Sequence, residues 1–378
     1  RPRPRGAAPP GRRARPPPPA PPDAGPLPLD GLIAADPEGL LGAATVRRFG
    51  PQLPFLFKVL AADRALSIQV HPTRAQAEAG YAAEEARGIP LDAPHRTYRD
   101  RGHKPELLCA LGDFEALCGF RPVAGTAALL DGLAVPLLAP WARALRHRPA
   151  EEVLPALLRH MLADVRPGPA DLAAVAEALR RAASADGPFT AACVAYARIA
   201  RDYPGDPGLV AALLLNHVRL RPGQALALDA GVPHAYLHGT GVELMANSDN
   251  VLRGGLTAKH LDVDGLLAVT SFRTGEPGVL TPGRAPGADP AEEHFPSPAA
   301  EFRLSRLRPT ATPVRIDRPD APQILLCTAG HAGLGTPDGH HLPLPPGHAA
   351  YLRPTPTPVH LTGLPDPRTE LYRATTAT

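Results

Sequence analysis

The spacing of apolar residues changes twice along the chain, and each spacing predicts a different kind of element. Residues 54–72 carry short apolar runs on either side of a turn at 62–64, which predicts two strands. From about residue 122 to 220 the apolar residues recur at helical intervals, as Leu172, Val175 and Leu179 do. The helices are predicted at 151–163, 169–185 and 188–203. From residue 223 onward, strand-like runs separated by glycine and proline return.

The order strand, helix, strand predicts a mainly β protein with a helical insertion. We expect a first β domain built from residues 29–121 and 216–265, a helical domain at 122–215, and a second, small β domain at 266–378. Residues 1–28 are rich in proline and arginine and have almost no large apolar side chain before Leu27. Because such a segment cannot build a core, we expect it to be disordered.

Composition and charge exclude several classes of function. The formal net charge is +3, and six arginines lie within the first 15 residues, so the remainder carries no basic field suited to nucleic acid. The apolar runs are shorter than a membrane span and no signal peptide opens the chain, so we expect a cytoplasmic protein that does not contact membranes. The four cysteines lack C-x-x-C spacing and indicate neither a disulfide framework nor a cysteine metal cluster.

Lysine is rare in this chain, and each lysine lies in a segment dense in polar residues. Only Lys58, Lys104 and Lys259 occur among the 40 basic residues. Because arginine supplies nearly all of the positive charge, a retained lysine indicates a position that a fork-shaped guanidinium cannot serve. Chance retention in an arginine-rich composition is the alternative. We predict that the three lysines belong to one site.

Three strand-like segments each present polar side chains on one face, because successive side chains of a strand point to opposite faces. These groups are Ser67, Gln69 and His71; Lys104 and Glu106; and His234, Tyr236 and His238. Polar groups that converge from separate strands are typical of the mouth of a small β-barrel.

A metal site is predicted from the imidazole, carboxylate and amide groups of these segments. His71, His234, Glu106 and Gln69 together offer two nitrogen and two oxygen ligands, which suit one Zn²⁺ ion with room for water or substrate. Glutamine is an uncommon zinc ligand. The alternative is that each histidine is only a hydrogen-bonded residue at a strand end, with Lys104 and Glu106 as a solvated pair.

The segment 241–259 contains polar and charged residues interleaved with apolar ones. These are Glu243, Asn247, Asp249, Asn250, Arg253, Thr257 and Lys259. Gly254 and Gly255 allow the backbone to approach a ligand closely. Cations so near the candidate carboxylates favour a phosphorylated or otherwise anionic small molecule.

Four ordered motifs resemble those of the type I mannose-6-phosphate isomerases. They are L-S-I-Q-V-H-P at 66–72, H-K-P-E at 103–106, P-H-A-Y at 233–236 and E-L-M-A-N-S-D-N-V-L-R-G-G-L-T-A-K at 243–259. The resemblance implies a cupin fold, with a catalytic jelly-roll barrel at 29–121 and 216–265, an inserted helical domain and a second cupin-like domain. It also implies one zinc ion per chain, bound at the same four positions that the spacing predicts.

The resemblance further implies the roles of the pocket residues. Arg253 matches the family's active-site arginine, and Lys104, Tyr236, Glu243 and Lys259 match pocket residues. Ser67 and Lys58 match groups near the substrate phosphate. The implied reaction interconverts mannose 6-phosphate and fructose 6-phosphate through an enediol. We expect the protein to be a monomer. Glu243, Lys104 and a metal-bound water remain open as the group that carries the proton.

The sequence departs from the family at its N-terminus. Family members begin with a segment containing Y-x-W-G and E-x-W-x-G-x-H motifs, whereas here a Pro/Arg tract stands there and the only tryptophan is Trp141. We hypothesise a truncated or out-of-frame N-terminus. Two alternatives to the isomerase follow: a catalytically inactive cupin that binds sugar phosphate or metal, and an isomerase for a related hexose phosphate.

Overall fold

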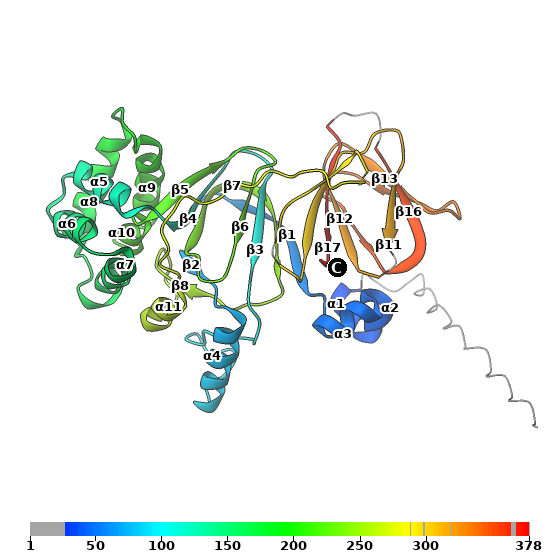
Figure 1. Cartoon of the computed structure of the whole chain (residues 1–378), viewed down its shortest axis with the longest axis horizontal. Helices are drawn as coiled ribbons and strands as arrows, with labels where there is room; N and C mark the ends of the chain where they lie inside the picture. The colour runs from blue at the N-terminus through cyan, green and yellow to red at the C-terminus, as the bar shows by residue number, and fades with distance from the viewer. Residues whose placement is uncertain (1–26, 288, 298, 319, 364–367, 378) are drawn as a thin grey trace, which may run out of the picture.

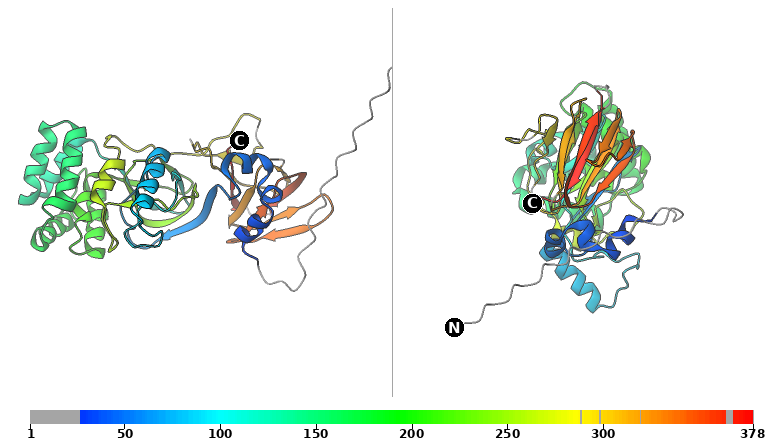
Figure 2. Two further views of the ribbon diagram at one scale, coloured as in Figure 1. Left: turned by 90° about the horizontal axis from the view of Figure 1, so that it is seen from below. Right: turned by 90° about the vertical axis from the view of Figure 1, so that its right-hand side faces the viewer.

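The computed structural model describes residues 27–378 except 288, 298, 319, 364–367 and 378. The segment expected to be disordered therefore lies outside the described residues, apart from Leu27 and Pro28. Figure 1 shows a group of helices at one end, a β unit in the middle and a second β unit at the other end. The view from below in Figure 2 shows the same linear order. This order confirms the predicted class, mainly β with a helical insertion.

The central β unit and its flanking elements contain the candidate site. They are β1 (Phe55–Ala62), β2 (Gln69–Val70), α4 (Arg74–Ala86), β3 (Glu106–Ala110), β4 (Phe114–Phe120), β5 (Leu215–Leu220), β6 (Ala225–Leu228), β7 (His234–Ala246), β8 (Leu252–Arg253) and α11 (Val263–Val269). The two strands predicted within 54–72 are thus confirmed as β1 and β2.

One long strand, β7, connects the two halves of the central unit. Its first half pairs with β2 and β4, and its second half pairs with β1 and β3. Gly239 lies between the halves with φ +119°, and a Cβ there would lie 2.6 Å from the carbonyl oxygen of Asp113. Only glycine tolerates this conformation and this close approach. The bend carries β7 from one sheet to the other, so both sheets face the same interior.

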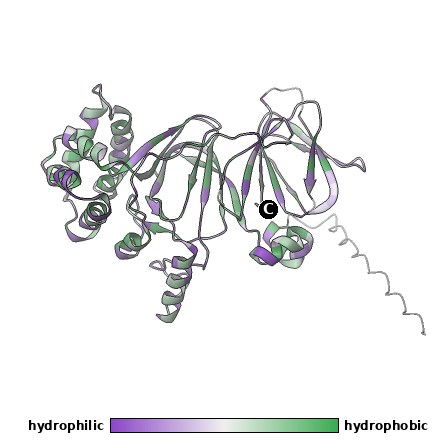
Figure 3. Cartoon of the chain, in the orientation of Figure 1, coloured by the Kyte–Doolittle hydropathy of each residue, from purple (hydrophilic) through white to green (hydrophobic). Residues whose placement is uncertain are grey.

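The predicted helices are confirmed. They are α7 (Ala150–Arg159), continued by one π-helical turn, η2 (His160–Asp164), α8 (Pro169–Ala183) and α9 (Thr190–Asp202). The same region contains α5 (Val123–Leu133), η1 (Pro136–Leu138), α6 (Ala139–His147) and α10 (Gly208–Ala212). Leu172, Val175 and Leu179 are buried on one stripe, as the helical spacing indicates. Hydrophobic and hydrophilic residues alternate in patches along these helices in Figure 3.

The second β unit packs directly on the central one. Its strands are β9 (Glu292–His294), β10 (Arg303–Leu307), β11 (Val314–Arg318), β12 (Gln323–Ala329), β13 (Ala332–Gly335), β14 (His341–Leu344), β15 (Ala349–Leu352), β16 (Thr355–Gly363) and β17 (Glu370–Thr375). Leu107 and Val242 of the central unit share one hydrophobic core with Phe302 and Tyr372. Burying a side chain of this kind stabilises the fold by roughly 1.5–3 kcal/mol, so the two units are held together by core packing.

The first helices of the chain lie against the second β unit rather than the first. They are α1 (Leu29–Ala35), α2 (Pro37–Leu41) and α3 (Ala43–Phe49). The Tyr351 hydroxyl donates to the carbonyl oxygen of Leu40 at 2.8 Å, and Arg48 donates to that of Ala377 at 3.1 Å. This packing differs from the expected grouping of residues 29–121. The domain boundaries themselves stay a prediction.

All four cysteines are buried and free. Burial raises the pKa of Cys109 and of Cys118 to about 12, so both are neutral, unreactive thiols at physiological pH. Within the described residues, none of the helices is both long enough and apolar enough to cross a membrane.

Candidate metal centre

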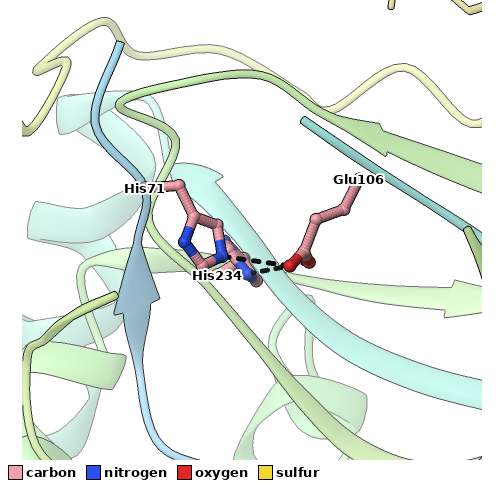
Figure 4. A group of neighbouring side chains, drawn as sticks. All are labelled: His71, Glu106 and His234. Carbon is pink, nitrogen blue, oxygen red and sulfur yellow. Dashed lines mark ion pairs between the residues drawn. The ribbon is translucent and has the colours of Figure 1, made fainter. Parts of the chain in front are cut away.

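Three of the four predicted metal ligands meet inside the central β unit. Candidate ligand atoms of His71, Glu106 and His234 all lie within 4.8 Å of one another. The Nε2 atom of His71 is 3.1 Å from Oε1 of Glu106, and Nε2 of His234 is 3.5 Å from Oε2. All three residues are buried. Figure 4 shows both imidazoles directed at the same carboxylate.

Strand ends place these side chains. Glu106 is the first residue of β3 and His234 the first of β7, while His71 directly follows β2. Because β2 and β3 both pair with β7, the three chain segments arrive at one point although they are far apart in sequence.

Both imidazoles are oriented by backbone carbonyl groups. Nδ1 of His71 lies 2.7 Å from the carbonyl oxygen of Asn250, and Nδ1 of His234 lies 3.0 Å from that of Val232. A carbonyl oxygen only accepts, so each Nδ1 donates, which leaves Nε2 as the atom that can bind a metal. Metal-binding histidines in proteins are commonly oriented in this way.

The residues fit a divalent cation. Burial lowers the pKa of His71, which favours its neutral form. Burial alone would raise the pKa of Glu106, but His71 and His234 hold it well below its usual value. A carboxylate and the Nε2 atoms of two imidazoles therefore face one another in a buried space. Zn²⁺ takes this donor set.

Strand pairing places Gln69 beside two other residues of the predicted site. It is directly opposite His234 on β7 and opposite Arg253 on β8. Residues directly opposite one another in an antiparallel pair share a face of the sheet, so Gln69 and Arg253 both belong to the face that carries His234. Its role as a fourth ligand stays a prediction.

A second polar group adjoins the metal centre. Nζ of Lys104 is 3.2 Å from Oε1 of Glu106, and the Tyr236 hydroxyl donates to Oε2 at 3.2 Å. Glu243 forms an ion pair with Lys58 at 2.7 Å across the β1–β7 pairing. Burial and the charge of Glu106 raise the pKa of Glu243 above its usual value. Burial, Glu243 and Glu106 raise that of Tyr236, which stays a hydrogen-bond donor.

The remaining predicted residues lie at different distances from this centre. Ser67 precedes Gln69 by two residues, and the described contacts include no partner for its side chain. Lys259 is exposed and lines a cavity of about 340 Å³ together with Arg253 and Arg99. Burial, and then the charge of Arg99, lower the pKa of Arg253. Lys104 thus contacts the candidate ligand Glu106, Lys58 contacts Glu243, and Lys259 lines the same cavity as Arg253.

His238 does not join the polar face predicted for β7. It is exposed, whereas His234 and Tyr236 are buried. The pairing of β4 with β7 shifts register between Glu115 and Ala116, which leaves one extra residue on β7. Such a bulge turns the side chains beyond it away from the interior.

Asn250 is a residue of the centre that the sequence reasoning named only as part of a polar segment. Its side chain is fully buried, donates to the carbonyl oxygens of Asp100 and Gly102, and accepts from the backbone N–H of Arg99. Its own carbonyl oxygen accepts from His71. One residue therefore connects a candidate ligand to the loop that leads into Lys104 and Glu106. A contact between segments about 150 positions apart leaves no local signal.

Asn250→Ala is expected to weaken zinc binding by about 10- to 100-fold, the usual effect of removing an outer partner of a metal ligand. The loop at 99–102 would lose its buried hydrogen bonds, and the carbonyl group that orients His71 would shift. Competition with a chromophoric chelator measures the dissociation constant. Asn247→Ala is the matched control, because Asn247 is exposed and makes a single side-chain hydrogen bond, to Leu53. Equal effects of the two substitutions would contradict this role.

Comparisons with known proteins show which family the chain resembles. The family described as phosphomannose isomerase type I, catalytic domain, matches residues 21–123. Mannose-6-phosphate isomerase of Salmonella typhimurium is 39% identical over 338 residues, which cover 89% of this chain and 83% of the relative. The Arabidopsis thaliana mannose-6-phosphate isomerase 1 is 31% identical over 361 residues, covering 92% and 78%.

Solved structures give the same result. A zinc-bound mannose 6-phosphate isomerase matches with a TM-score of 0.81 and 36% identity, covering 93% of this chain and 86% of the other. A variant of the Salmonella typhimurium phosphomannose isomerase matches with a TM-score of 0.82 and 35% identity, over the same shares. The predicted cupin-type fold class agrees with these matches. The chain therefore belongs to the type I phosphomannose isomerase family.

Proposed function

We propose that this protein interconverts mannose 6-phosphate and fructose 6-phosphate at a zinc centre held by His71, Glu106, His234 and Gln69. The observation that carries the proposal is the convergence of the His71 and His234 imidazoles on the Glu106 carboxylate in a buried space. Two histidines and a carboxylate form a donor set that is matched to Zn²⁺. When bound, zinc supplies a Lewis acid beside the oxygen atoms of the sugar.

The reaction requires a base that moves a proton between C2 and C1 of the sugar. We assign this role to Glu243. Its pKa is raised by burial and by Glu106, so its carboxylate is a better proton acceptor than an exposed one. The ion pair with Lys58 fixes the position of the carboxylate, and Tyr236 lies between Glu243 and Glu106.

Cationic side chains hold the negative charge that develops on the sugar oxygens. Lys104 is mostly buried beside Glu106, and Arg253 is opposite Gln69. Preorganised charges of this kind are commonly the largest contribution to catalysis. Ser67, Lys58, Tyr236 and Lys259 would bind the substrate, with Ser67 and Lys58 toward the phosphate and Lys259 beside Arg253. Action as a cytoplasmic monomer stays a prediction.

A coupled assay tests the function. Mannose 6-phosphate should yield fructose 6-phosphate, activity should disappear in the presence of a zinc chelator, and added zinc should restore it. Activity that is insensitive to the chelator would contradict the metal centre. Zinc binding without turnover of any hexose phosphate would instead support the inactive cupin.

A further inference from the structure

One carboxylate of the second β unit reaches the segments that carry the metal ligands. Glu301 lies in the bend between β9 and β10. Phe295, Ala299 and Phe302 around it are buried in the hydrophobic core that the two β units share. The backbone on both sides of Glu301 is therefore held in place by buried side chains.

Glu301 binds an arginine and a histidine of the central unit through a single oxygen atom. Arg74 donates to its Oε1 at 2.9 Å, and Nε2 of His103 lies 2.8 Å from the same atom. A carboxylate only accepts, so the imidazole N–H donates. The Glu301 side chain is 8% exposed, and His103 holds its pKa below the usual value against the opposing effect of burial. Charge-assisted hydrogen bonds at a buried carboxylate are stronger than exposed ones.

The two partners of Glu301 are close in sequence to metal ligands. Arg74 is the first residue of α4, three positions after His71, and Thr73 caps that helix. His103 directly precedes Lys104, and whereas Lys104 contacts Glu106, the ring of His103 contacts Glu301. Glu301 thus connects the segment after one ligand with the segment before another.

We propose that Glu301 is a positioning residue of the metal centre, through which the second β unit holds His71 and Glu106 at the separation that zinc requires. This inference rests on the proposed metal centre and gives the second β unit a role in it. Without the carboxylate, Arg74 and His103 lose the partner that they share. The two ligand segments are then joined by the contacts of Asn250 but no longer to the second β unit through Glu301. Ligands that must be drawn together on binding take up the metal less tightly.

The zinc dissociation constant of the full-length Glu301→Gln variant tests this role. We expect zinc binding weaker by roughly 5- to 10-fold, at the low end of the usual effect of outer-shell partners because Glu301 acts through intervening residues. Glu293→Gln is the matched control. It changes another glutamate–arginine pair of the second β unit, with Arg306 at 2.7 Å, which lies between β9 and β10. It should leave zinc affinity unchanged.

A double substitution separates positioning from a general loss of stability. Arg74→Met/His103→Asn should weaken zinc binding as much as Glu301→Gln does, and adding Glu301→Gln to it should have no further effect. The proposal would be overturned if Glu301→Gln kept full zinc affinity. It would also be overturned if Glu301→Gln weakened zinc binding in the Arg74→Met/His103→Asn variant as much as it does in the wild-type protein. A wild-type protein that binds no zinc would instead refute the proposed function, so the two failures are distinguishable.

Discussion

Replacing His71 or His234 with alanine is expected to weaken zinc binding by more than about 100-fold and to abolish turnover while the fold persists. Each substitution removes a ligand outright, which exceeds the usual effect of losing only an outer partner. In the wild-type protein, zinc at 100 times its dissociation constant should add about 2.7 kcal/mol to the free energy of unfolding. Thermal melting with and without zinc, together with metal content, measures both effects, and the variants should show no zinc-dependent shift.

His238→Ala is the matched control for these variants. His238 belongs to β7, as His234 does, but its side chain is exposed and is turned outward by the bulge opposite β4. It should retain zinc, turnover and the zinc-dependent melting shift. A His71→Ala protein that keeps stoichiometric zinc and full activity would rule out the proposed centre.

Glu243→Gln is expected to lower kcat by about 10²- to 10⁴-fold, the usual contribution of a positioned base. The amide preserves the shape of the side chain but cannot accept the proton. Zinc content should not change, because Glu243 lies outside the ligand set. Steady-state kinetics with metal analysis separates the two properties. In the wild-type protein the base must be ionised, so kcat/KM should fall as the pH decreases through the raised pKa of Glu243, above the ordinary value of 4.5.

The control for this substitution is Glu115→Gln. Glu115 is also a strand glutamate in an ion pair, with Arg198, but it lies opposite the exposed His238. It should leave kcat within about twofold of wild type, as is usual away from an active site. A Glu243→Gln variant with near-normal kcat would leave Lys104 or a water molecule as the proton carrier.

Much of the fold could be predicted from the chain because its periodicities are local. The helical spacing of Leu172, Val175 and Leu179, and the two apolar runs around 62–64, depend on nearest neighbours and appear unchanged in the structure. The path of α1–α3 was not predictable in this way. Their docking on the second β unit depends on contacts such as that of Leu40 with Tyr351, some 311 positions away.

The residue types of the site were determined by the sequence, whereas their partners were decided by the tertiary structure. Alternation along a strand identified His71, Glu106 and His234 as groups on polar faces, because side-chain direction in a strand follows from the backbone. It also placed His238 on that face, and the bulge opposite β4 removed it. The register shift in β7, the hydrogen bond between His71 and the Asn250 carbonyl group, and the contacts of Glu301 with Arg74 and His103 form only when distant segments meet. Long-range pairing of this kind has no signature in the local pattern, so only the folded chain reveals it.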